Sequence, residues 1–177
     1  GEPVFRSEYQ VTTLLDKLEL KSNTTMLDYG CAKSGTYRKL SMLRPDLILS
    51  LFDVSDRYTE FWSSFAMPDR WAVGEIPDEW NASFDVVTSF QVIEHINTPM
   101  EEVKKFNTIL RSGGVCYLTT PNIKSVVHSY LGDKWNVICY PEHLGYFSPK
   151  TLTKVFRENG FNKKELLAQD ISITRLK

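Results

Sequence analysis

The stretch Met26-Leu27-Asp28-Tyr29-Gly30-Cys31-Ala32-Lys33-Ser34-Gly35 decides the fold of this chain. It has the pattern of a buried strand that runs into a glycine turn, and the turn opens a helix. Gly30 and Gly35, together with the small Ala32 and Ser34, let a ligand lie against bare backbone, where larger side chains would block it. The spacing G-x-A-x-x-G therefore predicts a ligand-binding turn at the end of a strand.

Asp28 narrows the chemistry of that ligand. A carboxylate two residues before the first glycine would repel a pyrophosphate, but it would attract a ligand that carries an ammonium group. S-adenosylmethionine is such a ligand, because it has an α-amino group and a sulfonium and lacks phosphate. The alternative is that Asp28 only caps the turn through hydrogen bonds to backbone amides.

Strand and helix patterns alternate along the chain, which predicts a parallel sheet covered by helices on both faces. The expected fold is α/β, Rossmann-like and doubly wound, with a mostly parallel sheet. An antiparallel final strand is expected within residues 166–176. Helices are expected at residues 11–20, from 99 to the glycine pair at 113–114, and from 149 to 160; strands are expected at residues 25–29, 47–53, 71–73, 84–90 and 115–119.

Composition gives the broad class of the protein. A chain of 177 residues with 42% hydrophobic content is long enough for one domain with a sizeable core. We expect a single domain over residues 1–177, and the abrupt ends suggest that it was cut from a longer protein. The net charge of −1 gives no general attraction to nucleic acid or to an anionic membrane. A cytoplasmic location is expected, because neither a membrane span nor a signal peptide is recognisable.

The carboxyl ends of the predicted strands carry the candidate functional residues. In an open parallel sheet, ligands bind beyond these ends, near the point where the strand order reverses. Asp28 and Asp53 end the first two predicted strands, Glu75 follows the third, and Phe90 and Gln91 end the fourth.

With these residues in place, the chain resembles the class I S-adenosylmethionine-dependent methyltransferases over roughly residues 26–161. Leu27-Asp28-Tyr29-Gly30-Cys31 is similar to the first motif of that family, although Ala32 stands where many members have glycine. Phe84-Asp85-Val86-Val87, followed by Val92-Ile93-Glu94-His95-Ile96, resembles the segment around the fourth strand of the family.

The resemblance implies a set of cofactor-binding residues. Asp53 matches the acidic residue that holds both ribose hydroxyls, and Glu75 falls where the family surrounds the adenine. Two alternatives remain open: Asp53 as the N-cap of a helix near Ser55, and Glu75 as a solvated loop residue. The full set expected to bind S-adenosylmethionine is Asp28, Gly30, Ala32, Gly35, Asp53, Glu75, Phe90 and Gln91.

The run Pro141-Glu142-His143-Leu144-Gly145-Tyr146-Phe147-Ser148-Pro149 resembles a branch that acts on small molecules, including ubiquinone-type O-methyltransferases and bacterial sugar or glycan methyltransferases. We therefore expect in-line O-methylation of a small hydroxylated acceptor such as a sugar or glycan precursor. His95 and His143 are expected to flank the acceptor, with His143 as the general base. The alternative is that Glu94 and His95 only lock loops by hydrogen bonding.

A divalent metal is considered but not favoured. Gln91, Glu94, His95 and His143 resemble the E-x-x-E-H plus distant His arrangement of small-RNA terminal 2′-O-methyltransferases, where a divalent cation holds the acceptor. Glutamine here replaces the first glutamate, which removes a charge that a hard cation favours. The expected partner is a small molecule, with neither nucleic acid nor membrane, and the oligomeric state is left open. The alternative function is a catalytically silent cofactor-binding or partner module of a larger protein.

Overall fold

The computed structural model describes residues 4–162 and 165–166, and the chain divides into two compact units. The first unit comprises residues 1–90 and 108–119, and the second comprises residues 91–107 and 120–177. Within the described ranges, no helix combines the length and the apolar composition that crossing a membrane requires.

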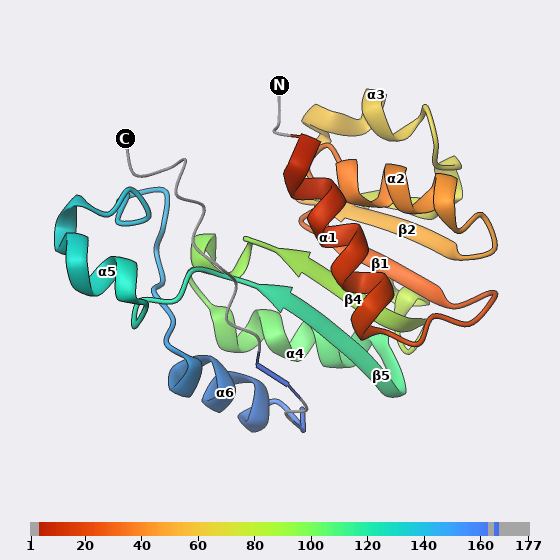
Figure 1. The fold of residues 1–177 in the computed structure, drawn as a ribbon. Helices are drawn as coiled ribbons and strands as arrows, with labels where there is room; N and C mark the ends of the chain where they lie inside the picture. Colours follow the sequence, from red (N-terminus) through yellow and green to blue (C-terminus); the bar gives the residue numbers. More distant parts are fainter. Residues whose placement is uncertain (1–3, 163–164, 167–177) are drawn as a thin grey trace. The chain divides into compact units, whose positions relative to one another are not determined.

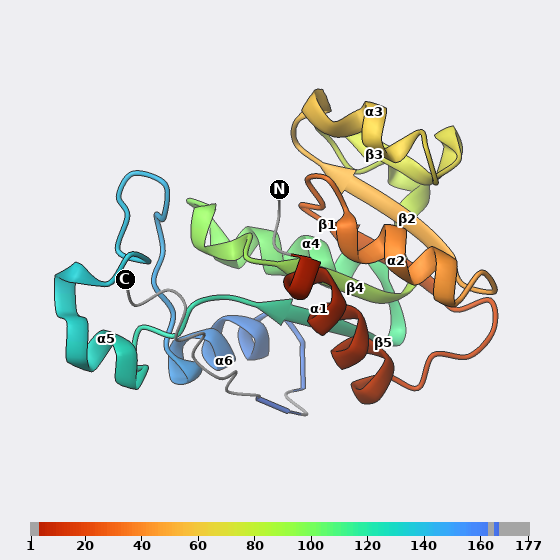
Figure 2. The ribbon, with the colours of Figure 1, turned by 45° about the horizontal axis from the view of Figure 1, so that its top comes forward.

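The first unit is built on a sheet of five described strands in the order β3-β2-β1-β4-β5 (Figures 1 and 2). All the neighbouring strands pair in parallel, and the chain order reverses at the central strand, between β1 and β4. The α/β, Rossmann-like class predicted from the sequence is confirmed, and the reversal marks the place where such sheets bind ligands. The strands are β1 (Thr25–Tyr29), β2 (Ile48–Asp53), β3 (Trp71–Val73), β4 (Phe84–Phe90) and β5 (Leu110–Thr119).

The expectation of an antiparallel final strand is not borne out. Every strand pair in the described part of the sheet is parallel, and β5 is the last strand along the chain there. Most of the segment predicted to hold that strand, residues 167–176, lies outside the described residues.

The start of β5 differs from the prediction. Helix α4 (Pro99–Ile109) gives way directly to β5 at Leu110, whereas the glycine pair at 113–114 was expected to end the helix. Instead, the pair lies where the register between β4 and β5 shifts, so that Phe84 faces Leu110 while Val86 faces Val115. A Cβ on Gly114 would lie 2.9 Å from the carbonyl oxygen of Arg111. Both glycines therefore lie at an irregularity within a strand: the close backbone approach leaves no room for a side chain on Gly114, and Gly113 has a φ of 79°, which favours glycine.

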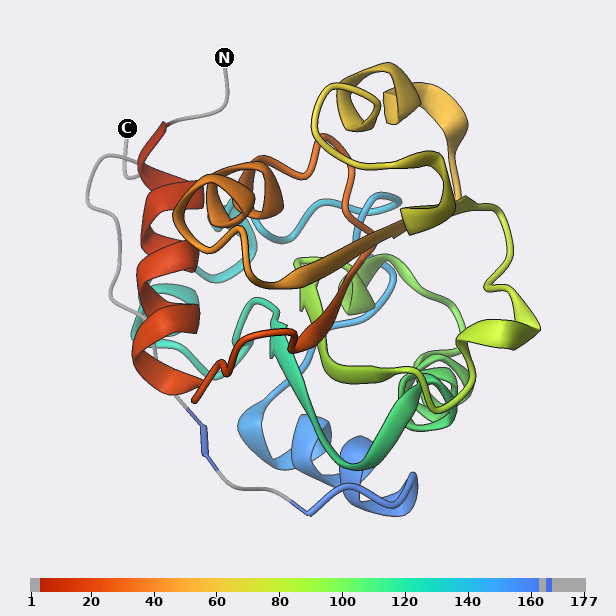
Figure 3. The ribbon, with the colours of Figure 1, turned by 90° about the vertical axis from the view of Figure 1, so that its right-hand side faces the viewer.

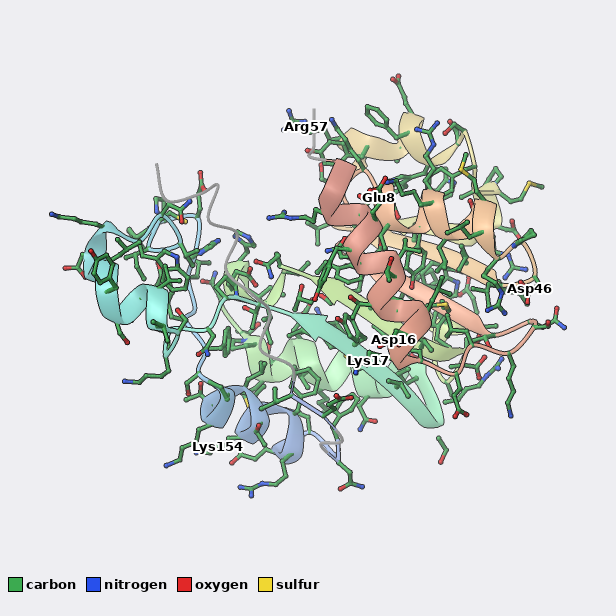
Figure 4. All side chains as sticks on the ribbon, viewed as in Figure 1. Glu8, Asp16, Lys17, Asp46, Arg57 and Lys154 are labelled. Carbon is green, nitrogen blue, oxygen red and sulfur yellow. The ribbon has the colours of Figure 1, made fainter. Side chains whose placement is uncertain are left out.

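Three helices complete the first unit: α1 (Val4–Lys17), α2 (Gly35–Leu43) and the short α3 (Thr59–Trp62). Figure 3 shows α1 and α2 side by side, and Lys39 of α2 forms an ion pair with Glu8 of α1 at 2.9 Å (Figure 4 labels Glu8). Full burial of a large apolar side chain contributes roughly 1.5–3 kcal/mol to stability. One cluster of buried core residues in this unit comprises Val11, Met26, Cys31, Tyr37, Leu40, Leu47, Leu51, Trp62 and Val86.

The second unit contains most of α4, together with α5 (Val126–Leu131) and α6 (Pro149–Glu158). Helix α6 begins as predicted. Ser148 is its N-cap and forms a reciprocal capping box with Thr151, and Pro149 is the first helical residue. The end of α6 is joined to α4, since the side-chain amide of Asn107 donates to the carbonyl oxygen of Asn159 at 3.0 Å. Short 3-10 turns in the two units are η1 (Asp56–Tyr58), η2 (Pro68–Arg70), η3 (Asp78–Trp80), η4 (Ile93–His95) and η5 (Gly132–Lys134).

Candidate active site

The glycine turn after β1 is held in a left-handed conformation at alternate residues. Gly30, Ala32 and Ser34 have φ angles of 73°, 44° and 47°. The backbone N–H groups of Gly30 and Cys31 both donate to the carbonyl oxygen of Phe52, at 2.8 and 3.0 Å, which ties the turn to the end of β2. Ala32 has a Cβ in a region that favours glycine, so this position stores strain.

Asp28 is a buried carboxyl beneath the turn, with 3% of its surface exposed. Its Oδ2 accepts a hydrogen bond from the Ser34 hydroxyl at 2.8 Å, and its Oδ1 lies 3.4 Å from the Thr88 hydroxyl. The Thr88 hydroxyl in turn lies 3.0 Å from that of Tyr37. Burial raises the pKa of Asp28 to about 7, although the two hydroxyls favour the ionised form. Among the described residues, the side chain of Asp28 is hydrogen-bonded to hydroxyl groups and not to backbone amides, so it does not cap the turn in the way that the alternative supposed.

Asp53, at the end of β2, connects three segments. Its Oδ2 accepts from the backbone N–H of Ala32 at 2.8 Å, and its Oδ1 accepts from that of Ser55 at 3.0 Å. The N-cap of the 3-10 turn η1 is Ser55 and not Asp53, so the structure differs from the alternative in which Asp53 is the N-cap. Each carboxylate oxygen can accept a further hydrogen bond, so Asp53 retains the capacity to bind two hydroxyl groups.

The remaining predicted cofactor residues lie at neighbouring strand ends or in the second unit. Glu75 is exposed and follows Gly74, whose N–H donates to the carbonyl oxygen of Asp53 at 3.0 Å. Phe90 ends β4 half-buried, with its ring 6.0 Å from that of Tyr117. Gln91 is the first residue of the second unit. The structure thus brings Asp28, Gly30, Ala32, Gly35 and Asp53 together at one turn, with Glu75 and Phe90 at the ends of β3 and β4.

In the second unit, Glu94, His95 and His143 form a side-chain cluster. One potential ligand atom from each residue lies within 4.8 Å of the other two. The two imidazole rings meet edge to face, with their centroids 4.7 Å apart. Glu94 is 1% exposed; its Oε2 accepts from the Thr120 hydroxyl at 2.9 Å, whereas its Oε1 has no hydrogen-bond partner in the described part of the chain.

Backbone carbonyls fix which ring nitrogen of each neutral imidazole carries the proton. The Nδ1 of His95 lies 2.6 Å from the carbonyl oxygen of Glu142, and the Nδ1 of His143 lies 2.7 Å from that of Val137. A carbonyl oxygen only accepts hydrogen bonds, so each Nδ1 must be the donor. In the neutral rings, the Nε2 atoms consequently carry the lone pairs.

The loop that carries His143 is anchored on Glu94 through its main chain. The carbonyl oxygen of Glu94 accepts from the N–H groups of Leu144 and Gly145, at 2.7 and 2.9 Å. A Cβ on Gly145 would lie 3.2 Å from the ring of Phe147, so a larger residue would crowd this loop. Glu94 and His95 thus both make hydrogen bonds to this loop, which agrees with the loop-locking alternative, and their role in catalysis stays a prediction.

Comparison with known proteins decides the family. Residues 5–166 match a family model described as a methyltransferase domain. The chain belongs to this methyltransferase family. Its methyl donor is S-adenosylmethionine, as the glycine turn and Asp28 predicted.

Solved structures similar to this methyltransferase share its fold at low sequence identity. A chain from the Haloferax volcanii complex of a methyltransferase with the Trm112 methyltransferase activator is 20% identical, with a TM-score of 0.70 over 88% of this chain and 69% of that one. The YcgJ protein of Bacillus subtilis is also 20% identical, with a TM-score of 0.69 over 86% and 68%. An S-adenosylmethionine-dependent methyltransferase of Thermotoga maritima is 20% identical, with a TM-score of 0.69 over 90% and 73%.

The side chains at the glycine turn of the methyltransferase fit S-adenosylmethionine. Between Asp28 and Gly35 the sequence has one basic residue, Lys33, and its Nζ lies 5.2 Å from the centroid of the Phe61 ring. The Asp28 carboxyl fits an ammonium and would repel a pyrophosphate when ionised, and Asp53 fits paired hydroxyls.

Sequence reasoning missed three supporting residues of the methyltransferase. Thr88 and Tyr37 complete the hydroxyl chain to Asp28, and Thr120 donates to Glu94. Thr120 directly follows the end of β5, and this position at a strand end is the signal that could have identified it. Thr88 and Tyr37 belong to a strand and a helix, and their sequence context gives no comparable signal.

Proposed function

We propose that this methyltransferase methylates a hydroxyl group of a small acceptor, a sugar or glycan precursor being the class that the sequence favours. The proposal rests on His143, a half-buried imidazole whose Nδ1 donates to the Val137 carbonyl. Its Nε2 therefore carries the lone pair that can accept a proton. An amine that arrives neutral needs less help from a base, so the two oriented imidazoles favour a hydroxyl acceptor.

Asp28, Asp53 and His143 have different roles in the proposed reaction. When bound, S-adenosylmethionine would supply an electrophilic sulfonium methyl group; the acceptor oxygen would form a bond to its carbon in line with the breaking C–S bond, whose electron pair the sulfur keeps. In this proposal Asp28 holds the ammonium of the cofactor and Asp53 holds its ribose hydroxyls. His143 accepts at Nε2 the proton that the acceptor oxygen loses. The Val137 carbonyl then stabilises the resulting imidazolium, because it already accepts from Nδ1.

His95 has a positioning role in the same proposal. Its ring stands edge to face with that of His143, and its Nδ1 is tied to the Glu142 carbonyl. The Nε2 of His95 can then accept a hydrogen bond from a second hydroxyl of the acceptor. A sugar offers such neighbouring hydroxyls, whereas a simple alcohol does not.

The test measures transfer of labelled methyl from S-adenosylmethionine to a panel of sugars, nucleotide sugars, phenols and amines. We expect hydroxylated acceptors to react and His143→Ala to lower kcat by about 10²–10⁴. Calorimetric affinity for S-adenosylhomocysteine should change by no more than a few-fold, since His143 is not proposed to hold the cofactor.

His128→Ala is the matched control, because His128 lies on α5 with its ring against Trp135 and outside the cluster. Its activity should equal that of the wild type. Transfer to amines alone would overturn the hydroxyl proposal. Cofactor binding without transfer to any acceptor would replace it with the silent-module alternative.

A further inference from the structure

Two hydroxyl groups lead from helix α2 to the carboxyl of Asp28. The Tyr37 hydroxyl lies 3.0 Å from that of Thr88, and the Thr88 hydroxyl lies 3.4 Å from Oδ1 of Asp28. All three side chains are buried, so bulk water does not compete for these groups. From this geometry we propose that Thr88 and Tyr37 are positioning residues, which stabilise both protonation states of Asp28 and so let it release its proton when the cofactor ammonium binds.

The direction of the hydrogen bonds follows from counting hydrogens. The Tyr37 hydroxyl has that of Thr88 as its one partner among the described residues, and a buried hydroxyl hydrogen without an acceptor is costly. Tyr37 therefore donates to Thr88, which leaves the single hydrogen of Thr88 for another acceptor. Two acceptors are within its reach, the carbonyl oxygen of Leu27 at 3.3 Å and Oδ1 of Asp28 at 3.4 Å.

Thr88 can serve both protonation states of Asp28 by turning its hydroxyl. When Asp28 is ionised, Thr88 donates to Oδ1, because a hydrogen bond to a charged acceptor is stronger than one to a carbonyl. When Asp28 is protonated at Oδ1, it donates to the second lone pair of the Thr88 oxygen, and Thr88 donates to Leu27. In both states each hydroxyl hydrogen has an acceptor, so the proton can leave without a rearrangement of the surrounding side chains.

The charges around Asp28 oppose its ionisation. Burial raises its pKa to about 7, and the negative charge of Asp53 acts in the same direction. The other titratable groups that interact with it are Cys31 in the turn and Tyr37 on α2, and burial raises the pKa of both, so they stay neutral near pH 7. The described partners of Asp28 include no lysine or arginine. An ammonium is the charge that this carboxylate lacks.

Cofactor binding should consequently release a proton to the solvent below about pH 7. The ammonium of S-adenosylmethionine, or of S-adenosylhomocysteine, stabilises the carboxylate of Asp28, and the proton that Asp28 loses passes to the buffer. This inference rests on the assignment of Asp28 to the cofactor ammonium in the proposed function. It does not involve the acceptor or His143, so absence of methyl transfer to hydroxylated acceptors would leave it standing.

The first experiment needs no variant. Calorimetric titration with S-adenosylhomocysteine at pH 6, in two buffers of different ionisation enthalpy, counts the protons released on binding. The amine of the ligand stays protonated at this pH, because its ordinary pKa is near 8. With a pKa of about 7 for Asp28, we expect release of about 0.9 proton per bound ligand. Release of less than about 0.3 proton would overturn the proposal. Absence of binding at both pH 6 and pH 8 would overturn it together with the cofactor site.

Variants separate a positioning role from a structural one. Thr88→Val removes the donor to the ionised carboxylate, so the affinity for S-adenosylhomocysteine should fall about tenfold at pH 6.5. The deficit should shrink to about twofold or less at pH 8.5, where Asp28 is largely ionised in both proteins. Thr88→Ser keeps the hydroxyl and should bind as the wild type does. Tyr37→Phe removes the far end of the chain of hydroxyls and should show a smaller deficit with the same pH dependence.

Two exposed positions supply the matched controls. Thr12→Val on α1 and Tyr130→Phe on α5 remove the same hydroxyl groups and should leave the affinity unchanged at both pH values. Titration of the ligand amine cancels in the ratio of variant to wild-type affinity. Deficits of Thr88→Val and Tyr37→Phe that are absent, or equal at the two pH values, would overturn the proposal. If Thr88→Val does not fold, Tyr37→Phe still decides, because it leaves no hydroxyl hydrogen without an acceptor.

Discussion

The Ser34 hydroxyl lies 2.8 Å from Oδ2 of Asp28 and donates to it, although Ser34 occupies the N-cap position of α2. An N-cap serine usually accepts from a backbone N–H of the first helical turn, and that bond is absent from the described contacts of Ser34. The left-handed φ of 47° at Ser34 accompanies this change of partner. The glycine turn is therefore linked directly to the buried carboxyl beneath it.

Asp28→Asn should stabilise the fold above pH 7 and weaken cofactor binding. Burial raises the pKa of Asp28 from 3.8 to about 7, so between these values the folded chain binds more protons than the unfolded chain. The contribution of Asp28 is fully present below about pH 4 and is lost as the pH rises through 7. Relative to Asp28→Asn, the wild type should lose on the order of 2–4 kcal/mol of unfolding free energy between pH 4 and pH 8.

Urea unfolding at both pH values measures this difference, and calorimetry with S-adenosylhomocysteine measures the cost in binding. Asp16→Asn, which removes an exposed carboxyl on α1, is the control and should show neither effect. Equal pH dependence of the wild type and Asp28→Asn would contradict the buried, protonated carboxyl.

Ala32→Gly should raise the free energy of unfolding by about 1 kcal/mol. The φ of 44° at Ala32 is a conformation that glycine adopts without strain. The contacts of this residue are made by its backbone: its N–H donates to Asp53 and its carbonyl accepts from the Trp62 indole at 2.6 Å. They survive the substitution. Ala66→Gly, at a position without positive φ, should instead lower stability, and urea unfolding compares the two variants.

The glycine turn and the strands were predictable because each has a local signature. Small residues at fixed spacing mark the turn, and near-continuous apolar runs mark buried strands such as β2. The start of β5 was not predictable from the sequence. A glycine pair such as Gly113 and Gly114 can end a helix or lie at an irregularity in a strand, and only the pairing with β4 distinguishes these two possibilities. The partners of Asp28 and Glu94 come from other elements, so folding reveals them and sequence spacing does not.

Thr25→Val should destabilise the sheet by about 1–2 kcal/mol. The Thr25 N–H and hydroxyl both donate to Oδ2 of Asp85 at 2.8 Å, which joins the start of β1 to β4. Partial burial opposes ionisation of Asp85, but the hydrogen bonds from Thr25 and Arg111 outweigh it and lower the pKa of this carboxyl. The stability that ionised Asp85 contributes is therefore present at neutral pH and lost in acid, so the deficit of Thr25→Val should shrink as the pH falls.

Urea unfolding at pH 7 and pH 3 checks this prediction. The same change at Thr12, on an exposed position of α1, is the control and should alter stability by less than about 0.5 kcal/mol. A stability deficit of Thr25→Val that is the same at both pH values would contradict the prediction, because it would show that the effect of the substitution does not depend on the ionisation of Asp85.

Thr120→Val should lower the free energy of unfolding by about 1–3 kcal/mol. The Thr120 hydroxyl donates to Oε2 of Glu94 at 2.9 Å, and valine keeps the shape while removing the donor. Because Oε1 of Glu94 has no hydrogen-bond partner in the described part of the chain, both oxygens of this buried carboxyl group would then be unpartnered. Thr120→Ser restores the hydroxyl and should recover the stability, which urea unfolding measures. Equal stability of Thr120→Val and the wild type would contradict a stabilising role for this hydrogen bond.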